Sequence, residues 1–202
     1  QNQNSHTSGN NGGFVVTDIV KKPIIYIYPI EKMDVEVKLG NPQYLSCTYP
    51  KYKNGWSVTA DVDGTLVDKN TEKNLYALYW EGKEVPKNIN LKEGFCVKGK
   101  DTATFLEEKL SLLGLSDKEA EEFIIYWLPK MEENNYNYIR FETKEEQDKS
   151  MPLEITPKPD NLIRVMMDWK GLDEKIEVQE QNLETPIREG YTVVEWGGTE
   201  IK

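Results

Sequence analysis

The sequence predicts an α+β fold in which a mostly antiparallel β-sheet or sandwich carries one αα-hairpin. Between residue 14 and about residue 97, several short segments alternate apolar and polar residues, which is the period of a half-buried strand. From Asp101 the apolar residues recur every three or four positions, and strand-like segments return after Asn134. A doubly wound α/β sheet would need a helix between successive strands, so the α+β class is favoured.

The first half of the chain supplies the predicted strands. PIIYIYP at 23–29 is β-branched and aromatic between two prolines, which suits strand ends because proline cannot donate to a ladder. MDVEVKL at 33–39 alternates and places its apolar residues on one face. Segments in the same style follow at 44–50, 55–62 and 74–80.

The first predicted helix has one apolar stripe. This stripe consists of Phe105, Leu106, Leu110 and Leu113. Gly114 follows at the position where a helix C-terminus favours a residue without Cβ strain. We therefore expect this helix to end at Gly114.

The second predicted helix begins at a capping box formed by Ser116 and Glu119. Its apolar stripe consists of Ala120, Phe123, Ile124, Trp127 and Leu128. Pro129 is expected to end the helix, because proline removes a backbone donor and clashes with the preceding turn. The two helices form an αα-hairpin whose stripes face one core.

Further strands are predicted after the hairpin, at 137–141, 153–156, 161–169, near 175, and at 191–196. The charged run KEEQDK at 144–149 indicates a solvated helix face. We expect four segments along the chain: a flexible polar tether at 1–13, a β-rich subdomain at 14–100, a helical hairpin and following strand at 101–150, and a C-terminal β segment at 151–202 that packs on the rest.

Charge and hydropathy narrow the possible partners. The formal net charge of −10 argues against a nucleic-acid partner, because such footprints are built from clustered Lys and Arg. No segment approaches the roughly 20 apolar residues of a transmembrane helix. The polar start QNQNSHTSGNNGG at 1–13 suggests a leader that follows a removed export signal. We therefore expect an extracytoplasmic protein, either secreted or held at the cell surface as a lipoprotein through a removed N-terminus.

Cysteine and histidine chemistry is not expected. The two cysteines, Cys47 and Cys96, are too few for a zinc cage, and the single histidine, His6, lies in the tether. Both cysteines lie in apolar strand-like segments, which favours two buried free thiols, with a disulfide as the alternative if the protein is exported. No cofactor is predicted.

The segment ADVDGTLVD at 60–68 resembles the first motif of the haloacid-dehalogenase phosphatase superfamily. That resemblance would make Asp61 a nucleophile and Asp63 a general acid/base. The flanking residues alternate like a half-exposed strand, however, and Asp-Gly is a favoured two-residue hairpin turn with positive φ at both positions. A plain hairpin is the favoured interpretation. A weak calcium site on Asp61, Asp63 and Asp68 is a further alternative.

Four segments together are similar to a family of uncharacterised bacterial proteins that are often predicted to be exported or lipoprotein-like. These segments are KPIIYIYP at 22–29, YWEG at 79–82, EEFIIYWLP at 121–129 and TVVEWGG at 192–198. The resemblance covers nearly the whole predicted fold. It implies no activity and no catalytic residues.

The same segments place Glu81, Glu122 and Glu195 near the tryptophans Trp80, Trp127 and Trp196. If these glutamates converged on one cleft, desolvation by the indole rings would favour the protonated acid and prepare one of them for acid/base catalysis. The tryptophans could also stack on a sugar or peptide, although strand and helix spacing favours a core position for them.

The sequence therefore favours a module that binds an unknown ligand or protein partner. The alternative is a carboxylate-based hydrolase acting on a glycan or a phosphate ester. A pocket lined by several acids and a tryptophan would favour the enzyme, and an apolar patch or groove would favour the binding module.

Overall fold

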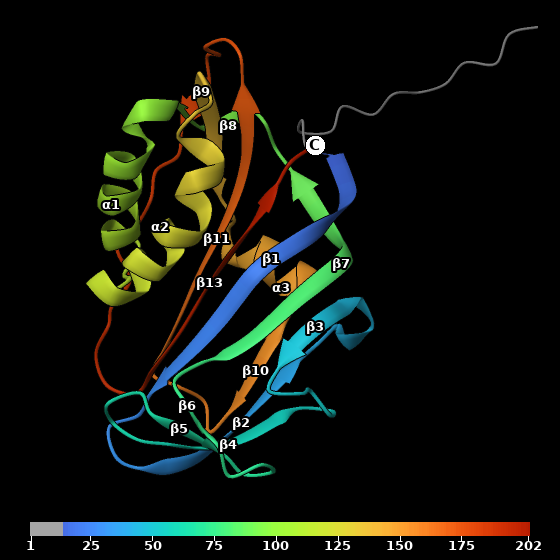
Figure 1. Cartoon of the computed structure of the whole chain (residues 1–202), viewed down its shortest axis with the longest axis vertical. Helices are drawn as coiled ribbons and strands as arrows, with labels where there is room; N and C mark the ends of the chain where they lie inside the picture. The colour runs from blue at the N-terminus through green and yellow to red at the C-terminus, as the bar shows by residue number, and fades with distance from the viewer. Residues whose placement is uncertain (1–13) are drawn as a thin grey trace, which may run out of the picture.

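The computed structural model describes residues 14–202 and has an α+β fold, as the sequence predicts. Its larger sheet has eight strands in the order β12-β8-β9-β11-β13-β1-β7-β3 (Figure 1). Their bounds are β1 Phe14–Tyr28, β3 Leu45–Tyr49, β7 Leu78–Ile89, β8 Glu93–Lys98, β9 Tyr136–Phe141, β11 Asn161–Leu172, β12 Gln179–Glu180 and β13 Thr192–Glu200. The predicted polar tether at 1–13 lies outside the described residues.

The centre of this sheet joins the two ends of the described chain. β13 lies between β11 and β1, parallel to β11 and antiparallel to β1. Apart from β11–β13 and the short β12–β8 pair, the strand pairs among residues 14–202 are antiparallel. The sheet therefore draws strands from each of the segments 14–100, 101–150 and 151–202, and its strand order differs from the chain order.

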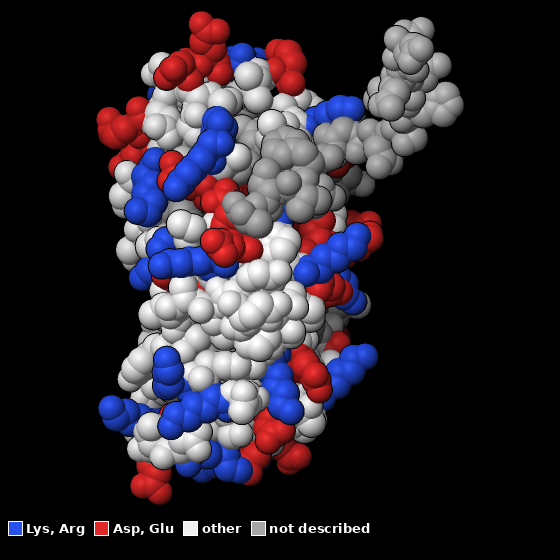
Figure 2. All heavy atoms as spheres, turned by 90° about the vertical axis from the view of Figure 1, so that its right-hand side faces the viewer, with Lys and Arg blue, Asp and Glu red and all other residues white. Residues whose placement is uncertain are grey.

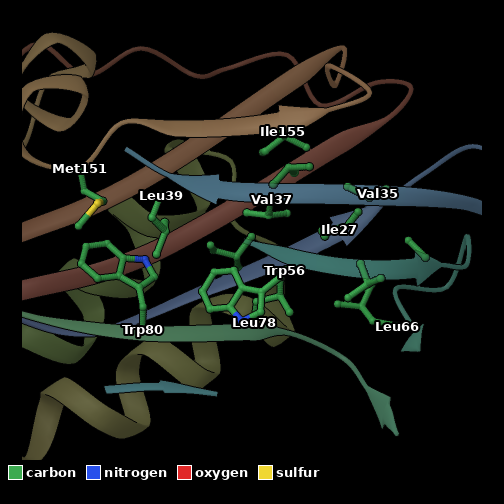
Figure 3. Close-up of a cluster of buried hydrophobic side chains, with 14 of the residues drawn as sticks. Ile27, Val35, Val37, Leu39, Trp56, Leu66, Leu78, Trp80, Met151 and Ile155 are labelled. Atoms are coloured by element: carbon green, nitrogen blue, oxygen red, sulfur yellow. The ribbon is translucent and has the colours of Figure 1, made fainter. Parts of the chain in front are cut away.

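A smaller sheet packs on one face of the larger one. Its strands, in the order β10-β2-β4-β5-β6, are β10 Leu153–Thr156, β2 Met33–Leu39, β4 Trp56–Ala60, β5 Leu66–Asp68 and β6 Asn74–Leu75. The alternation predicted for 33–39 is confirmed, because Val35, Val37 and Leu39 are buried while the residues between them are exposed. Figure 3 shows these side chains in one core with Met151, which lies between α3 (Lys144–Ser150) and β10, and with others from both sheets: Ile27, Trp56, Leu66, Leu78, Trp80 and Ile155.

The predicted αα-hairpin covers the opposite face of the larger sheet. α1 spans Thr102–Leu112 and α2 spans Asp117–Met131 (Figure 1). Gly114 has the positive φ of +94° expected after a helix end, and the capping box of Ser116 and Glu119 is present. The stripes of both helices join one second core with the sheet, which contains Leu106, Leu110, Leu115, Phe123, Trp127, Phe141, Met167, Val194 and Trp196.

Pro129 does not end the second helix, so that prediction was wrong. α2 continues to Met131 with Pro129 inside it. Proline leaves the carbonyl of Ile125 without its usual donor, but Ile125 is exposed, so water can solvate this part of the helix. Met131 is fully buried, and its packing offsets the lost hydrogen bond.

The segments at 144–149 and near 175 were predicted as a helix face and a strand. KEEQDK is helical, as expected, and forms α3, Lys144–Ser150, which begins at a capping box between Thr143 and Glu146. The strand predicted near 175 is wrong. Only β12 pairs with the larger sheet there, because the side chains of 173–177 remain exposed rather than meeting a core. Two short 3₁₀ helices, Pro42–Tyr44 and Gly99–Asp101, connect strands and the hairpin.

The surface gives no sign of a phosphate-binding footprint on the face that Figure 2 shows. Lys and Arg side chains are interspersed there with Asp and Glu, above and below an uncharged band (Figure 2). Among residues 14–202, none of the helices is long and apolar enough to cross a membrane.

Candidate functional site

A groove of about 620 Å³ lies where β10 and β11 diverge into different sheets. Residues of α3 and β10 line it, together with Leu113, Glu184 and Pro186 from other parts of the chain. The remaining residues around the groove come mainly from α3, β10, β11 and the turn between the two strands: Glu142, Lys144, Gln147, Asp148, Leu153, Glu154, Ile155, Lys158, Pro159, Asp160, Leu162, Ile163, Arg164 and Val165. The size suits a small ligand or a short peptide segment.

Arg164 lies at the groove and is almost completely buried, with its side chain 4% exposed. Its Nε donates to Glu195 Oε1 at 2.9 Å, and its Nη2 donates to the Met151 carbonyl at 2.9 Å. Its Nη1 makes no hydrogen bond within the described chain, although Asp148 Oδ1 lies 3.7 Å away. Nη1 is itself buried, so the Asp148 carboxylate is its nearest partner and its hydrogen-bonding capacity is only partly used.

A buried charge cluster adjoins Arg164 on the same face of the larger sheet. Lys87 donates to both oxygens of Glu142, at 3.1 and 2.8 Å, and its Nζ lies 3.9 Å from Asp168 Oδ1. Arg140 makes a two-bond contact with Glu146, both bonds 2.7 Å long, and contacts Asp168 Oδ2 at 3.3 Å. Such pairs keep their charges in the interior only because each ion has a close partner.

Asp168 is the member of this cluster without a full set of partners. It is fully buried, and its Oδ1 accepts no hydrogen bond. Burial and the nearby Glu142 carboxylate raise the pKa of Asp168 to about 8, against the lowering effect of Lys87 and Arg140. Asp168 therefore carries a proton over much of the neutral range.

The pKa values of two neighbouring ion-paired groups shift so as to favour their charged forms. Burial alone would raise the pKa of Glu146, but the hydrogen bonds from Arg140 outweigh it and lower that pKa. Burial alone would lower the pKa of Lys87, but Glu142 and Asp168 raise it. Glu146 and Lys87 are therefore both held in their charged forms.

A second polar cluster lies under α2 on the opposite face of the sheet. Glu119 accepts hydrogen bonds from Arg188, at 2.6 and 2.9 Å, and from the Tyr28 hydroxyl at 2.6 Å. Burial would raise the pKa of Glu119, but the Arg188 and Tyr28 hydrogen bonds lower it. Every Glu119 oxygen is used within the protein, so this cluster fastens the residue 188 region to α2.

The three glutamates proposed from the sequence are not brought together. Glu195 pairs with Arg164 and accepts from Trp80 Nε1 at 2.9 Å, on the face of the smaller sheet. Glu122 accepts from Tyr26 at 2.9 Å on the helical face. Glu81 forms an ion pair with Lys21 at 3.3 Å. The structure therefore contains no cleft shared by these three side chains.

The tryptophans Trp80, Trp127 and Trp196 occupy the two cores. Their side chains are 0%, 1% and 1% exposed, so a sugar or peptide cannot stack on them in this conformation. Trp196 donates to the Tyr26 hydroxyl at 2.9 Å, which satisfies its buried indole nitrogen. These residues support the groove only indirectly, through Trp80 and its contact with Glu195.

The DVDGT segment forms a hairpin turn between β4 and β5. Asp61 N–H donates to the Thr65 carbonyl, which leaves a three-residue loop of 62–64 in place of the predicted two-residue turn. Positive φ occurs at Gly64 only, which is typical of a type I turn followed by a G1 bulge. The predicted turn type was wrong because Asp63 keeps an ordinary φ.

The same geometry bears on the phosphatase and calcium alternatives. β4 pairs antiparallel with β2 and β5, whereas the phosphatase motif follows a buried parallel strand. Asp61 and Asp63 accept from backbone N–H groups of the turn, and Asp68 accepts from Asn70 and Thr71. In residues 14–202 no three acidic, histidine or cysteine side chains are grouped as metal ligands would be.

Both cysteines are free, as favoured, but they are not both buried. Cys47 is exposed and Cys96 is partly buried. Cys47 lies on β3, which is an edge strand of the larger sheet, so its side chain meets no covering layer. The apolar neighbours in the sequence could not reveal this edge position.

Sequence reasoning missed the residues that define the groove and its charge cluster. A signal was present, because Arg164 and Asp168 lie four residues apart in the apolar run LIRVMMDW and therefore face the same side of a strand. Arg140 and Glu142 repeat this pattern two residues apart. Charged residues two or four positions apart in an apolar strand lie on the same face of the sheet, so this pattern indicates a buried polar cluster.

Comparison of the chain with protein-family models, with curated proteins and with solved structures finds no match. The resemblance to uncharacterised bacterial exported proteins therefore stays a prediction.

Proposed function

We propose that this protein is a binding module that holds a ligand or protein partner in the groove between β10 and β11 and uses no cofactor. The observation that carries the proposal is the groove itself, which has largely apolar walls and the partly satisfied guanidinium of Arg164 beside it. Apolar surface would supply affinity, and a few placed polar groups would orient the ligand. A location outside the cytoplasm stays a prediction.

The rigid surroundings of Arg164 support this proposal. Its two other nitrogens are held by Glu195 and Met151, so the guanidinium is fixed before a ligand arrives. A donor fixed in advance loses little conformational entropy on binding. The groove is also open to solvent at its rim, where Leu162 is 39% exposed.

The proposal is tested by a thermal-shift screen across glycans, phosphorylated compounds, peptides, calcium and magnesium. A ligand at a hundredfold its Kd stabilises the folded state by about 2.7 kcal/mol, which is readily measured. We expect at least one class to raise the melting temperature of the wild type and not that of Leu162→Glu. Ile125→Glu, at an exposed position of α2 outside the groove, is the matched control and should respond like the wild type. A shift that survives Leu162→Glu would reject the groove as the site.

One observation favours the alternative of a carboxylate-based hydrolase. Glu142 lines the groove beside Asp168, and a carboxyl group with a raised pKa next to a second carboxyl group is the arrangement used for acid/base catalysis. Against it, Asp168 is fully buried and the Glu142 side chain is 2% exposed and paired with Lys87. Hydrolysis of nitrophenyl glycosides or nitrophenyl phosphate that disappears in Glu142→Gln would establish the enzyme. We expect no hydrolysis by the wild type or by Glu142→Gln.

A further inference from the structure

We propose that the ligand of the groove is an extended peptide that adds as an antiparallel strand to the N-terminal half of β11, in line with β9. This inference rests on the proposed function of the groove as the binding site. It assigns the chemical class of the partner and the backbone groups that recognise it.

Half of one edge of β11 has no strand beside it. β13 pairs with β11 along residues 161–169, whereas β9 pairs only with residues 167–172 on the other side. The last bond on that side runs from Glu142 N–H to the Met166 carbonyl, at 2.9 Å. The chain then turns at Thr143 into α3, so β9 stops while β11 continues (Figure 1).

Strand alternation shows which residues of β11 direct their N–H and C=O groups to this open edge. Asn161 N–H donates to Tyr191 on the β13 side, and the Met166 carbonyl faces the β9 side. The peptide groups of Leu162 and Arg164 therefore point to the β9 side, into the position where a strand is missing. Gln147 Nε2 already occupies the Arg164 carbonyl at 2.9 Å. Both groups of Leu162 and the N–H of Arg164 remain for a partner.

The other strand that lines the groove, β10, also has an unpaired edge. β10 is the terminal strand of the smaller sheet and pairs only with β2. Its Pro152 carbonyl accepts from Gly40 on the β2 side, so the peptide groups of Leu153 and Ile155 point away from β2. Unpaired edges of this kind are templates for strand addition. A peptide backbone matches such repeated donors and acceptors, which a glycan or small metabolite does not.

The side chains around the groove select the sequence of the peptide. The apolar lining includes Leu153, Ile155, Leu162, Ile163, Val165 and Pro159. The charged residues of the lining, apart from the buried Glu142 and Arg164, are four acids, Asp148, Glu154, Asp160 and Glu184, and two bases, Lys144 and Lys158. This excess of acids, on a protein of net charge −10, complements a basic peptide. We therefore expect alternating residues, apolar toward the groove and Lys or Arg toward solvent.

The test uses an array of synthetic nine-residue peptides that alternate Val, Leu, Ile or Phe with Lys, Arg, Thr or Glu. We expect the full chain to bind peptides rich in Lys and Arg and to reject those rich in Glu. The tightest peptide is then resynthesised with a single N-methyl group at each position in turn. The Leu162 carbonyl is the acceptor left free on this half of β11, because Gln147 and Glu142 occupy those of Arg164 and Met166. Methylation of the one peptide N–H that donates to it should weaken binding about tenfold, the effect of one lost hydrogen bond, and methylation of the residues on either side should leave Kd unchanged.

Variants of the protein test the same edge from the other side. Leu162→Val keeps the N–H and measures what the side chain contributes, and Leu162→Pro, which also removes the N–H, should bind about tenfold more weakly than Leu162→Val. Hydrogen exchange of the Leu162 and Arg164 amides should slow when the peptide is bound. If Leu162→Pro does not fold, the N-methyl series and the hydrogen-exchange measurement still show whether the peptide pairs with β11.

The outcomes separate this inference from the proposed function. A non-peptide ligand whose thermal shift depends on Leu162, with no binding on the array, would overturn strand addition and leave the groove as the binding site. Peptides that bind equally well with an N-methyl group at every position would overturn it as well. Absence of every ligand on both tests would remove the proposed function together with the inference.

Discussion

At the scale of single residues, the interior of the larger sheet holds more acids than it can pair one to one. Three cations each have a carboxylate of their own in the pairs Lys87–Glu142, Arg140–Glu146 and Arg164–Glu195. Asp168 is the fourth carboxyl, and it shares Lys87 and Arg140 with the others. Neutralisation by a proton is the remaining way to bury it, which explains the direction of its pKa.

Asp168→Asn should become more stabilising, relative to the wild type, as the pH rises from about 4 to about 8. In this window the unfolded aspartate ionises near its ordinary pKa of 3.8 while the folded one, with a pKa of about 8, keeps its proton. Ionisation of the unfolded state alone favours unfolding, so the wild type loses stability as pH rises and asparagine does not. Urea unfolding of both proteins at pH 5 and pH 9 measures the difference.

Asp63→Asn is the control for the sign of the pH dependence of stability. Asp63 is fully exposed, and its pKa is lowered by the backbone hydrogen bond from Thr65, so any effect of its removal appears above pH 4 as a loss of stability. A stability difference for Asp168→Asn that did not change with pH would show that Asp168 is ionised in the folded protein throughout.

At the scale of elements, local signals located the helix starts better than the helix ends. The Ser116–Glu119 capping box was predicted and is present, because a cap depends on four consecutive residues only. Pro129 was expected to end α2, but the burial of Met131 extends the helix by another half turn. Edge positions such as Cys47 on β3 likewise depend on which strands are absent, a property of the assembled sheet.

Ser116→Ala should lower the free energy of unfolding by about 1 kcal/mol, the usual loss for a helix cap. Thr143→Ala, which removes the corresponding cap of α3, should cost a similar amount and serves as the matched comparison. Glu119→Ala should cost more than either, because it also removes the carboxylate partner of Arg188 and the acceptor of the Tyr28 hydroxyl. Guanidinium chloride unfolding provides the three values. A Glu119→Ala loss no larger than that of Ser116→Ala would contradict the role of this cluster.

At the scale of the whole molecule, one sheet is shared by two cores. Ile25, Ile27 and Trp80 of the larger sheet face the smaller sheet, while Tyr26 and Trp196 face the helices. Because neighbouring residues of one strand belong to different cores, neither core can separate without disrupting the strands of the other. The chain is therefore expected to unfold as one cooperative unit.

Leu66→Ala and Leu110→Ala test this cooperativity. Leu66 lies in the core under the smaller sheet and Leu110 in the core under the helices, and both are fully buried. Each substitution should cost about 2–5 kcal/mol and shift a single transition. Tryptophan fluorescence and far-ultraviolet circular dichroism should give coincident curves for both variants. Two separate transitions in either variant would show that the smaller sheet or the helical hairpin unfolds independently.

The sequence by itself determined the α+β class, most strand positions and the αα-hairpin. These features follow from periodicities of two and 3.6 residues, which each segment carries without reference to its neighbours. Only the tertiary structure decided the groove and the charge cluster. Arg164, Lys87 and Glu142 come from distant segments, and a periodic pattern shows which side of a strand is buried without showing what lies opposite. The free edge of β11 is likewise a property of where β9 stops, and that is set by the turn into α3.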